Sequence, residues 1–185
     1  FLNHLKANAK TASGIDLSQE QINVCLSFGL DAQCIALENI TQKYDCLTAI
    51  FDVINYIPKE NIHSFFQAAY DTLNNDGYFI FDTNSLFGFE EIAQGCLNIN
   101  LEDKFIAIDA FFEDEKLRTD ITFFTQEETN NYHREDGSIT QYYYETKKLK
   151  EILQKCGFEI EKIMNFNLHS DEDADKLIFI CKKPQ

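Results

Sequence analysis

The chain has few basic residues, few turn-forming residues and no long apolar run, and each shortage argues against a class of protein. It contains 16 Lys and Arg residues but 31 Asp and Glu residues, which gives a formal net charge of −15 at pH 7. Nucleic-acid partners require clustered basic charge, so this balance argues strongly against them. No apolar run approaches the roughly 20 residues that cross a bilayer, and the opening FLNHLKANAK is too polar for a signal-peptide core. With 2 Pro and 7 Gly, but 17 Phe and 8 Tyr, residues 1–185 are predicted to form a single globular domain.

The six cysteines contain no C-x-x-C pair, which argues against a zinc site, and the histidines share no ligand spacing. No metal site is therefore predicted. Cys34, Cys46 and Cys181 lie within apolar runs, where cysteine behaves as a small buried hydrophobic residue. We expect all six cysteines to be reduced and structural, and the protein to be cytoplasmic.

The first two-thirds of the chain alternate between strand-like and helical segments. A short strand ends at Asp16, and Ser18 with Gln21 forms a capping-box pattern for a helix that Gly29 stops. A second helix is expected to begin at Pro58. Further apolar runs predict strands at 32–37, 46–51 and 77–83. This order is typical of a parallel sheet wrapped by helices.

From about residue 104 the segments are rich in β-branched and aromatic residues, with no helix between them. We predict a small antiparallel sheet inserted over 97–145, with a two-residue hairpin turn at Asp136-Gly137. That turn pairs Tyr132 with Gln141, and strand alternation then places both side chains on one face, together with Arg134 and Tyr143.

The C-terminal segments predict a helix at 148–156 and strands at 158–166 and 176–183. Only about nine residues separate these two strands, too few for a parallel crossover, so they are expected to pair antiparallel. The predicted fold class is therefore α/β: a Rossmann-like, mostly parallel sheet that ends in an antiparallel hairpin, with a small inserted antiparallel sheet.

Four segments together, GIDLSQEQI, YDCLTAIFDVINYIP, LNNDGYFIFDTNS and LKEILQKCGFEIEK, resemble class I S-adenosylmethionine-dependent methyltransferases. The likeness is to the bacterial small-molecule type with an inserted antiparallel sheet. It implies S-adenosylmethionine as cofactor, a small-molecule acceptor and methyl transfer by in-line displacement. The family's glycine-rich turn is absent, and counting back about 20 residues from Asp16 leads to just before Phe1. Since the only methionine is Met164, we expect the chain to be N-terminally incomplete, without its first strand and glycine turn.

The resemblance assigns cofactor contacts to the ends of the early strands. Asp16 is expected to accept hydrogen bonds from the ribose hydroxyls, although an acid here also suits a helix entry. Leu17 is placed against the adenine face. The position that carries an acid for the adenine amino group is Ala36 in this chain, so Glu38 or the backbone of Leu37 is expected to take its place.

Residues after the next strands are expected near the reacting end of the cofactor. Phe51 and Asp52 follow a buried strand, and ligands bind at the carboxyl edge of open α/β sheets. Asn55 and Tyr56 resemble the family pattern and are candidates for substrate contact or for helix capping. Asn84, at the end of the strand over 77–83, is a candidate either for contact with the substrate or for a role in the turn that follows.

The inserted sheet supplies further candidates. The resemblance implies that this sheet covers the mouth of the active site, which makes Gln141 and Tyr143 substrate candidates. His133, Tyr132 and Arg134 are the candidates for a catalytic group. Two other functions stay open. One is a catalytically silent cofactor-binding module. The other is a nicotinamide-dependent oxidoreductase, although the terminal antiparallel hairpin argues against it.

Overall fold

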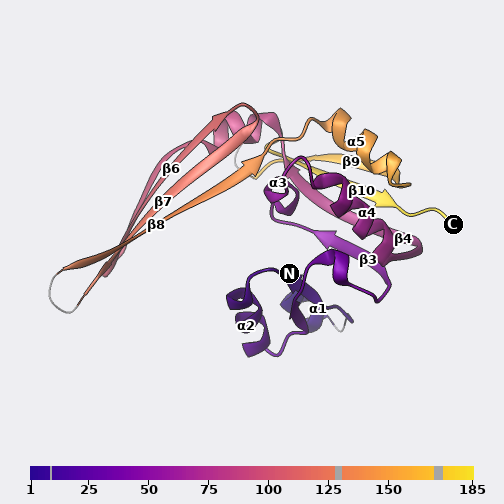
Figure 1. Cartoon of the computed structure of the whole chain (residues 1–185), viewed down its shortest axis with the longest axis horizontal. Helices are drawn as coiled ribbons and strands as arrows, with labels where there is room; N and C mark the ends of the chain where they lie inside the picture. The colour runs from indigo at the N-terminus through magenta and orange to yellow at the C-terminus, as the bar shows by residue number, and fades with distance from the viewer. Residues whose placement is uncertain (9, 128–130, 169–172) are drawn as a thin grey trace.

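The computed structural model describes residues 1–8, 10–127, 131–168 and 173–185. Within these ranges the strands form one two-stranded sheet and two four-stranded sheets (Figure 1). We call the sheet made by β3 (Tyr44–Ala49), β4 (Leu73–Asn84), β10 (Lys176–Lys182) and β9 (Glu159–Phe166) the body sheet. We call the sheet made by β5 (Gly95–Asn100), β6 (Lys104–Glu113), β7 (Lys116–Gln126) and β8 (Tyr132–Tyr142) the arm. The arm extends away from the rest of the molecule, as Figure 1 shows. No helix in these ranges is long and apolar enough to cross a membrane.

The N-terminal elements form the two-stranded sheet and its helices. They are α1 (Leu2–Ala7), β1 (Gly14–Asp16), α2 (Gln19–Ser27), β2 (Ala32–Cys34) and the 3₁₀ helix η1 (Leu37–Asn39). β1 and β2 pair in parallel. The Ser18 side chain accepts a hydrogen bond from the Gln21 N–H, and Gly29 has φ +66 after α2. The predicted cap and stop of this helix are both confirmed.

The body sheet has the strand order β3-β4-β10-β9. β3 (Tyr44–Ala49) and β4 (Leu73–Asn84) are parallel, and β10 (Lys176–Lys182) pairs antiparallel with both β4 and β9 (Glu159–Phe166). The predicted terminal antiparallel hairpin is confirmed. In the described structure β3 has a single ladder partner, β4, and the β1–β2 sheet is separate from it.

The helices of this part of the chain are α3 (Val53–Tyr56), α4 (Ile62–Thr72) and α5 (Thr146–Lys155). The predicted helix start at Pro58 is wrong. The Asn61 N–H donates to the Pro58 carbonyl at 2.8 Å, which closes a turn, and the regular helix begins at Ile62.

The core of the body sheet is aromatic. Phe66 from α4, Phe79 and Phe81 from β4, and Phe179 from β10 are all 0–1% exposed. The rings of Phe81 and Phe179 stack with centroids 4.7 Å apart, and those of Phe66 and Phe81 lie 5.5 Å apart. This burial explains why the strands read as almost continuous apolar runs.

The arm contains β5 (Gly95–Asn100), β6 (Lys104–Glu113), β7 (Lys116–Gln126) and β8 (Tyr132–Tyr142), preceded by the π-helical segment η2 (Gly88–Ala93). All neighbouring strands pair antiparallel in chain order. An inserted antiparallel sheet is therefore present, as predicted.

The hairpin turn predicted at Asp136-Gly137 is wrong, because both residues lie within β8 and pair with Thr122 and Ile121 of β7. The Asp136 carboxylate accepts hydrogen bonds from the Thr122 hydroxyl at 2.7 Å and from Arg134. Cross-strand pairing along the whole of β7 therefore overrides the turn preference of the dipeptide.

The tight turn of the arm is instead made by Asp114 and Glu115, with φ 50 and 60. They connect β6 to β7, where Glu113 pairs with Lys116. Positive φ at both central residues matches the hairpin turn that follows strand twist.

The correction also changes which side chains share a face. In a continuous β8, Tyr132 and Arg134 lie on one face, and Gln141 on the other. The predicted common face of Tyr132, Arg134 and Gln141 is therefore wrong.

The cysteine predictions are confirmed in part. All six cysteines are free, and Cys181 is fully buried in β10. Cys34 and Cys46, however, are exposed. Cys46 lies on β3, the edge strand of the described body sheet, so the apolar run around it is only partly covered.

Candidate active site

The carboxyl ends of β3 and β4 form the centre of the candidate site. Because these strands are parallel, the residues after Ala49 lie beside Asp82, Thr83 and Asn84 at the same edge of the sheet. The chain leaves β3 through Phe51 and Asp52, which both have left-handed backbone, φ 63 and 64. The Phe51 side chain is 78% exposed at this edge.

An ion-pair cluster closes the turn. Lys176, the first residue of β10, contacts the Asp52 carboxylate and donates to Asp82 Oδ2 at 3.0 Å. The Asp52 N–H points at the same Asp82 oxygen, at 3.3 Å. These three side chains, from three separate parts of the chain, are 12–24% exposed.

The cluster shifts the protonation of its members. Burial, with the Asp82 charge, raises the pKa of Asp52 despite the opposing effect of Lys176. Burial lowers the pKa of Lys176, but its hydrogen bonds to the two carboxylates outweigh this and raise it. Lys176 is therefore charged at neutral pH.

Asn55 is fully buried beneath this turn and joins three elements. Its Nδ2 donates to Thr83 Oγ1 at 3.0 Å and to the Tyr142 carbonyl at 2.9 Å, while its Oδ1 accepts from the Asn84 N–H at 2.9 Å. The amide thus connects α3 to the end of β4 and to the base of the arm.

Two other substrate candidates lie around Asn55. Asn84 is 9% exposed, at the end of β4. Tyr56 is 48% exposed at the end of α3, and burial, followed by the Asp52 charge, raises the pKa of its phenol. Tyr56 is thus the more accessible of the two.

The candidates at β1 and β2 lie in the separate two-stranded sheet. Asp16 is exposed at the end of β1. Its Oδ1 accepts a hydrogen bond from the N–H of Ser18, the N-cap of α2, at 2.8 Å, so the carboxylate stabilises the start of that helix. Leu17 is 77% exposed. The Cys34 thiol lies 3.5 Å from the Leu17 carbonyl, which brings the ends of β1 and β2 together.

The adenine candidates follow β2. Ala36 precedes η1, Leu37 packs against the core of the body sheet, and Glu38 is exposed. The described structure thus places the predicted cofactor residues on the strand ends of two sheets.

The catalytic candidates of the arm lie apart from this edge. Tyr132 is 57% exposed, the His133 ring is 3.6 Å from the Glu135 carboxylate, and Arg134 pairs with Asp136. At about 3.3 Å per residue, Arg134 lies roughly 26 Å along β8 from Tyr142, the residue that contacts Asn55. The start of β8 is at the far end of the arm in Figure 1.

The last two candidates lie at the base of the arm. Gln141 is 9% exposed. Tyr143 packs against Phe89 and Phe112, with ring centroids 6.0 and 6.5 Å apart. These two residues, unlike Tyr132, His133 and Arg134, are near the α3 end of the arm.

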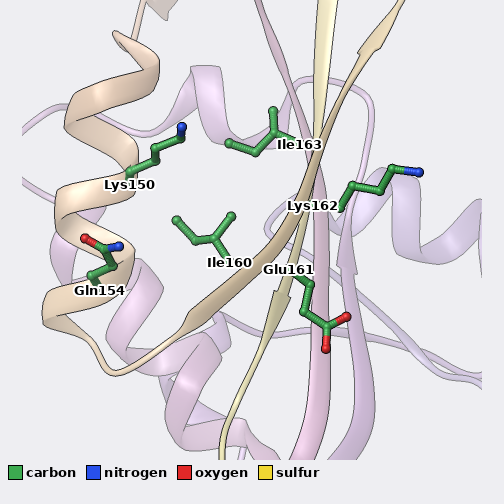
Figure 2. Close-up of a pocket in the computed structure, with 6 residues that line it drawn as sticks. All are labelled: Lys150, Gln154, Ile160, Glu161, Lys162 and Ile163. Atoms are coloured by element: carbon green, nitrogen blue, oxygen red, sulfur yellow. The ribbon is translucent and has the colours of Figure 1, made fainter.

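A hollow between α5 and β9 is a separate feature, and Figure 2 shows the residues that line it. Lys150 and Gln154 project from α5 toward Ile160 and Ile163 of β9 (Figure 2). None of these residues belongs to the cluster at the ends of β3 and β4, so the hollow is distinct from the candidate site.

Sequence reasoning missed Lys176. A charged residue at the start of an apolar strand looks like a solvated strand end. Its antiparallel pairing with Asn84, however, places Lys176 diagonally across from Asp82 on the same face. That register was the signal that could have identified it.

Comparison with known proteins agrees with this architecture. No protein-family model matches the chain. A protein of Geobacillus sp. (strain WCH70), named "Putative methyltransferase", is 25% identical to this chain in an alignment 186 residues long. The alignment covers 92% of this chain and 75% of that protein. "Putative methyltransferase YqeM" of Bacillus subtilis (strain 168) is 23% identical over 92% of this chain and 74% of its own length.

Solved structures give the fold. An S-adenosylmethionine-dependent methyltransferase from Clostridium acetobutylicum ATCC 824 superposes with a TM-score of 0.78, at 24% identity, over 95% of this chain and 76% of that one. The chain has the class I methyltransferase fold. The sugar N-methyltransferase KedS8 from Streptoalloteichus sp. ATCC 53650 has the same methyltransferase fold and superposes with a TM-score of 0.79 at 12% identity. The superposition covers 100% of this chain and 75% of KedS8.

Proposed function

We propose that the chain belongs to an S-adenosylmethionine-dependent methyltransferase that acts on a small-molecule acceptor. The observation that carries this proposal is the placement of Asp16 and the Phe51–Asp52 turn at strand ends of a methyltransferase fold. In open α/β sheets, ligands bind outside the carboxyl ends of the strands.

The residues at this edge fit the chemistry of the cofactor. The exposed Asp16 carboxylate is an acceptor suited to hydroxyl donors, as a ribose presents them. The exposed Phe51 ring offers an aromatic face, which attracts a cationic centre such as a sulfonium. For the adenine, Glu38 or the backbone of Leu37 would take the place of the acid that is absent at Ala36.

When bound, S-adenosylmethionine supplies an electrophilic methyl group on sulfur. The task of the chain is to bind and orient the two reactants. Asp16 would hold the ribose, and the turn at Phe51 and Asp52 would position the methionine end. Tyr56, exposed beside that turn, is the substrate candidate best placed to orient an acceptor.

A small acceptor is favoured by charge and by likeness. The net charge of −15 disfavours anionic polymers. Several proteins of the same fold have names that specify small acceptors, among them the sugar N-methyltransferase KedS8 and the amino pentose methyltransferase CalS10. The six free cysteines support a reducing compartment such as the cytoplasm.

Calorimetric titration of the protein with S-adenosylmethionine tests the proposal. We expect saturable binding that Asp16→Ala weakens at least tenfold, because the ribose hydroxyls lose their acceptor. Glu20→Gln on the same helix entry is the matched control, since Glu20 is exposed and bonds to Ser18. Absence of binding at millimolar cofactor would overturn the proposal. Binding without methylation of any acceptor in a small-molecule panel would instead favour a silent binding module.

A further inference from the structure

The turn after β3 is held in an unfavourable backbone conformation. Phe51 and Asp52 are consecutive and both have positive φ, although neither is glycine. Left-handed backbone is costly for residues with a Cβ and persists only where the surroundings fix it. Something must therefore hold this turn from outside.

The contacts that hold it come from β4 and β10. The Asp52 N–H donates to Asp82 Oδ2 at 3.3 Å, and Lys176 bridges the carboxylates of Asp52 and Asp82. The Lys176 side chain is only 14% exposed, so its ammonium is directed at the two acids rather than at solvent. A lysine 124 residues away in the chain thus closes the turn.

We propose that Lys176 is a positioning residue of the cofactor site, acting through the Phe51–Asp52 turn that it clamps against β4. This inference rests on the function proposed above, because the turn is the part of the site assigned to the methionine end of the cofactor. Lys176 itself contacts neither reactant in this scheme.

The clamp works by charge. Without the ammonium, two partly buried carboxylates would face each other and repel, and the turn would open. The titratable groups around them are Asp52 at the turn, Tyr56 on α3, Asp82 on β4 and Lys176 on β10. The acid that precedes β10, Asp175, accepts hydrogen bonds from the Leu168 N–H instead.

The main test compares Lys176→Met with the unaltered protein by calorimetric titration of S-adenosylmethionine at pH 8. At pH 8 we expect at least tenfold weaker binding. Lys176→Arg keeps a cation between the two carboxylates, so its loss of affinity should stay below threefold. Lys182→Met is the matched control, because Lys182 lies at the other end of β10 and pairs with the exposed Asp76 at 2.8 Å.

A double variant, Lys176→Met with Asp82→Asn, covers the case in which the single variant does not fold. The amide that replaces the Asp82 carboxylate can accept from the Asp52 N–H and donate to the Asp52 carboxylate, so it removes the repulsion while keeping the turn. We expect the double variant to bind within tenfold of the unaltered protein, and so to recover affinity that Lys176→Met loses.

The outcomes separate the two proposals. If the unaltered protein does not bind, the proposed function fails and this inference fails with it. If it binds, four results overturn the role of Lys176 alone. They are a loss below tenfold in Lys176→Met, a loss above threefold in Lys176→Arg, an equal loss in Lys182→Met, or a double variant weakened more than tenfold.

Discussion

The body sheet and the arm are both four-stranded and both rich in aromatic residues, but they place these residues differently. In the body sheet, Phe79, Phe81 and Phe179 are 0–1% exposed and pack ring against ring. In the arm, Phe111 is 64% and Phe123 38% exposed. The body sheet is thus stabilised by side-chain packing, while the arm depends more on its backbone ladders and cross-strand pairs.

The largest expected effect comes from emptying the body core. Phe81→Ala should lower the free energy of unfolding by about 3–5 kcal/mol, because a fully buried ring leaves a cavity. Phe111→Ala in the arm should change it by less than about 0.5 kcal/mol. Urea unfolding followed by circular dichroism measures both, and equal losses would contradict the contrast between the two sheets.

The junction between the two sheets should come next. Asn55→Ala removes bonds to Thr83, to the Asn84 backbone and to the Tyr142 carbonyl. We expect a loss of about 2–3 kcal/mol, since buried partners are left unsatisfied. Asn98→Ala, at an exposed position of β5, is the control. A loss within the error of the control would show that the amide does not connect body and arm.

The free energy of unfolding should depend on pH through a thiol in the buried core of the body sheet more than through a thiol of the arm. Burial raises the pKa of the Cys181 thiol to about 12. In the unfolded chain the thiol ionises at about pH 8.5. The stability that the buried, neutral Cys181 thiol contributes is therefore fully present below that pH, and it is lost as the pH rises toward 12, because only the unfolded chain then ionises. At pH 10 the loss should amount to about 2 kcal/mol.

Unfolding of Cys181→Ala at pH 8 and pH 10, under reducing conditions, measures this contribution. The variant should lose less stability over that interval than the unaltered protein does. Cys96→Ala, at an exposed position of the arm, should retain most of the dependence, because its hydrogen bond to the Asp109 carboxylate, more than burial, raises the pKa of that thiol. An unchanged dependence in Cys181→Ala would refute the assignment.

The smallest expected effect lies at the tight turn of the arm. Asp114 has φ 50, where glycine is unstrained. Asp114→Gly should therefore raise the free energy of unfolding by about 0.5–1 kcal/mol. Glu113→Gly, one residue earlier within β6, should lower it instead. Thermal unfolding compares the two variants, and destabilisation by both would argue against the strained turn.

The sequence predicted what depends on local pattern and on strand order. The Ser18 cap, the stop at Gly29 and the antiparallel hairpin of β9 and β10 are all confirmed. These features follow from a few neighbouring residues or from the length of a connection. Asp136-Gly137 shows the limit of this reasoning, because pairing with a distant strand decided its conformation.

The candidate site was predictable only in outline. Strand ends pointed to Asp52 and to Asn84, two residues after Asp82, but the cation between Asp52 and Asp82 comes from the far end of the chain. No local pattern could show that Lys176 reaches both acids, since this depends on the register of β10 against β4. Side-chain burial, which makes Asn55 a connector, likewise follows only from packing.

The regular ladder between β7 and β8 also bears on how proteins of this kind can vary. Pairing runs without a bulge from Lys116–Tyr142 to Gln126–Tyr132. Because side chains alternate along a strand, deleting two opposed residues from within each arm strand would leave the side chains beyond the deletion on their present faces, whereas deleting one from each strand would turn them to the opposite faces. The arm is thus a modular extension: its reach can be changed in two-residue steps while its attachment at Asn55 stays the same.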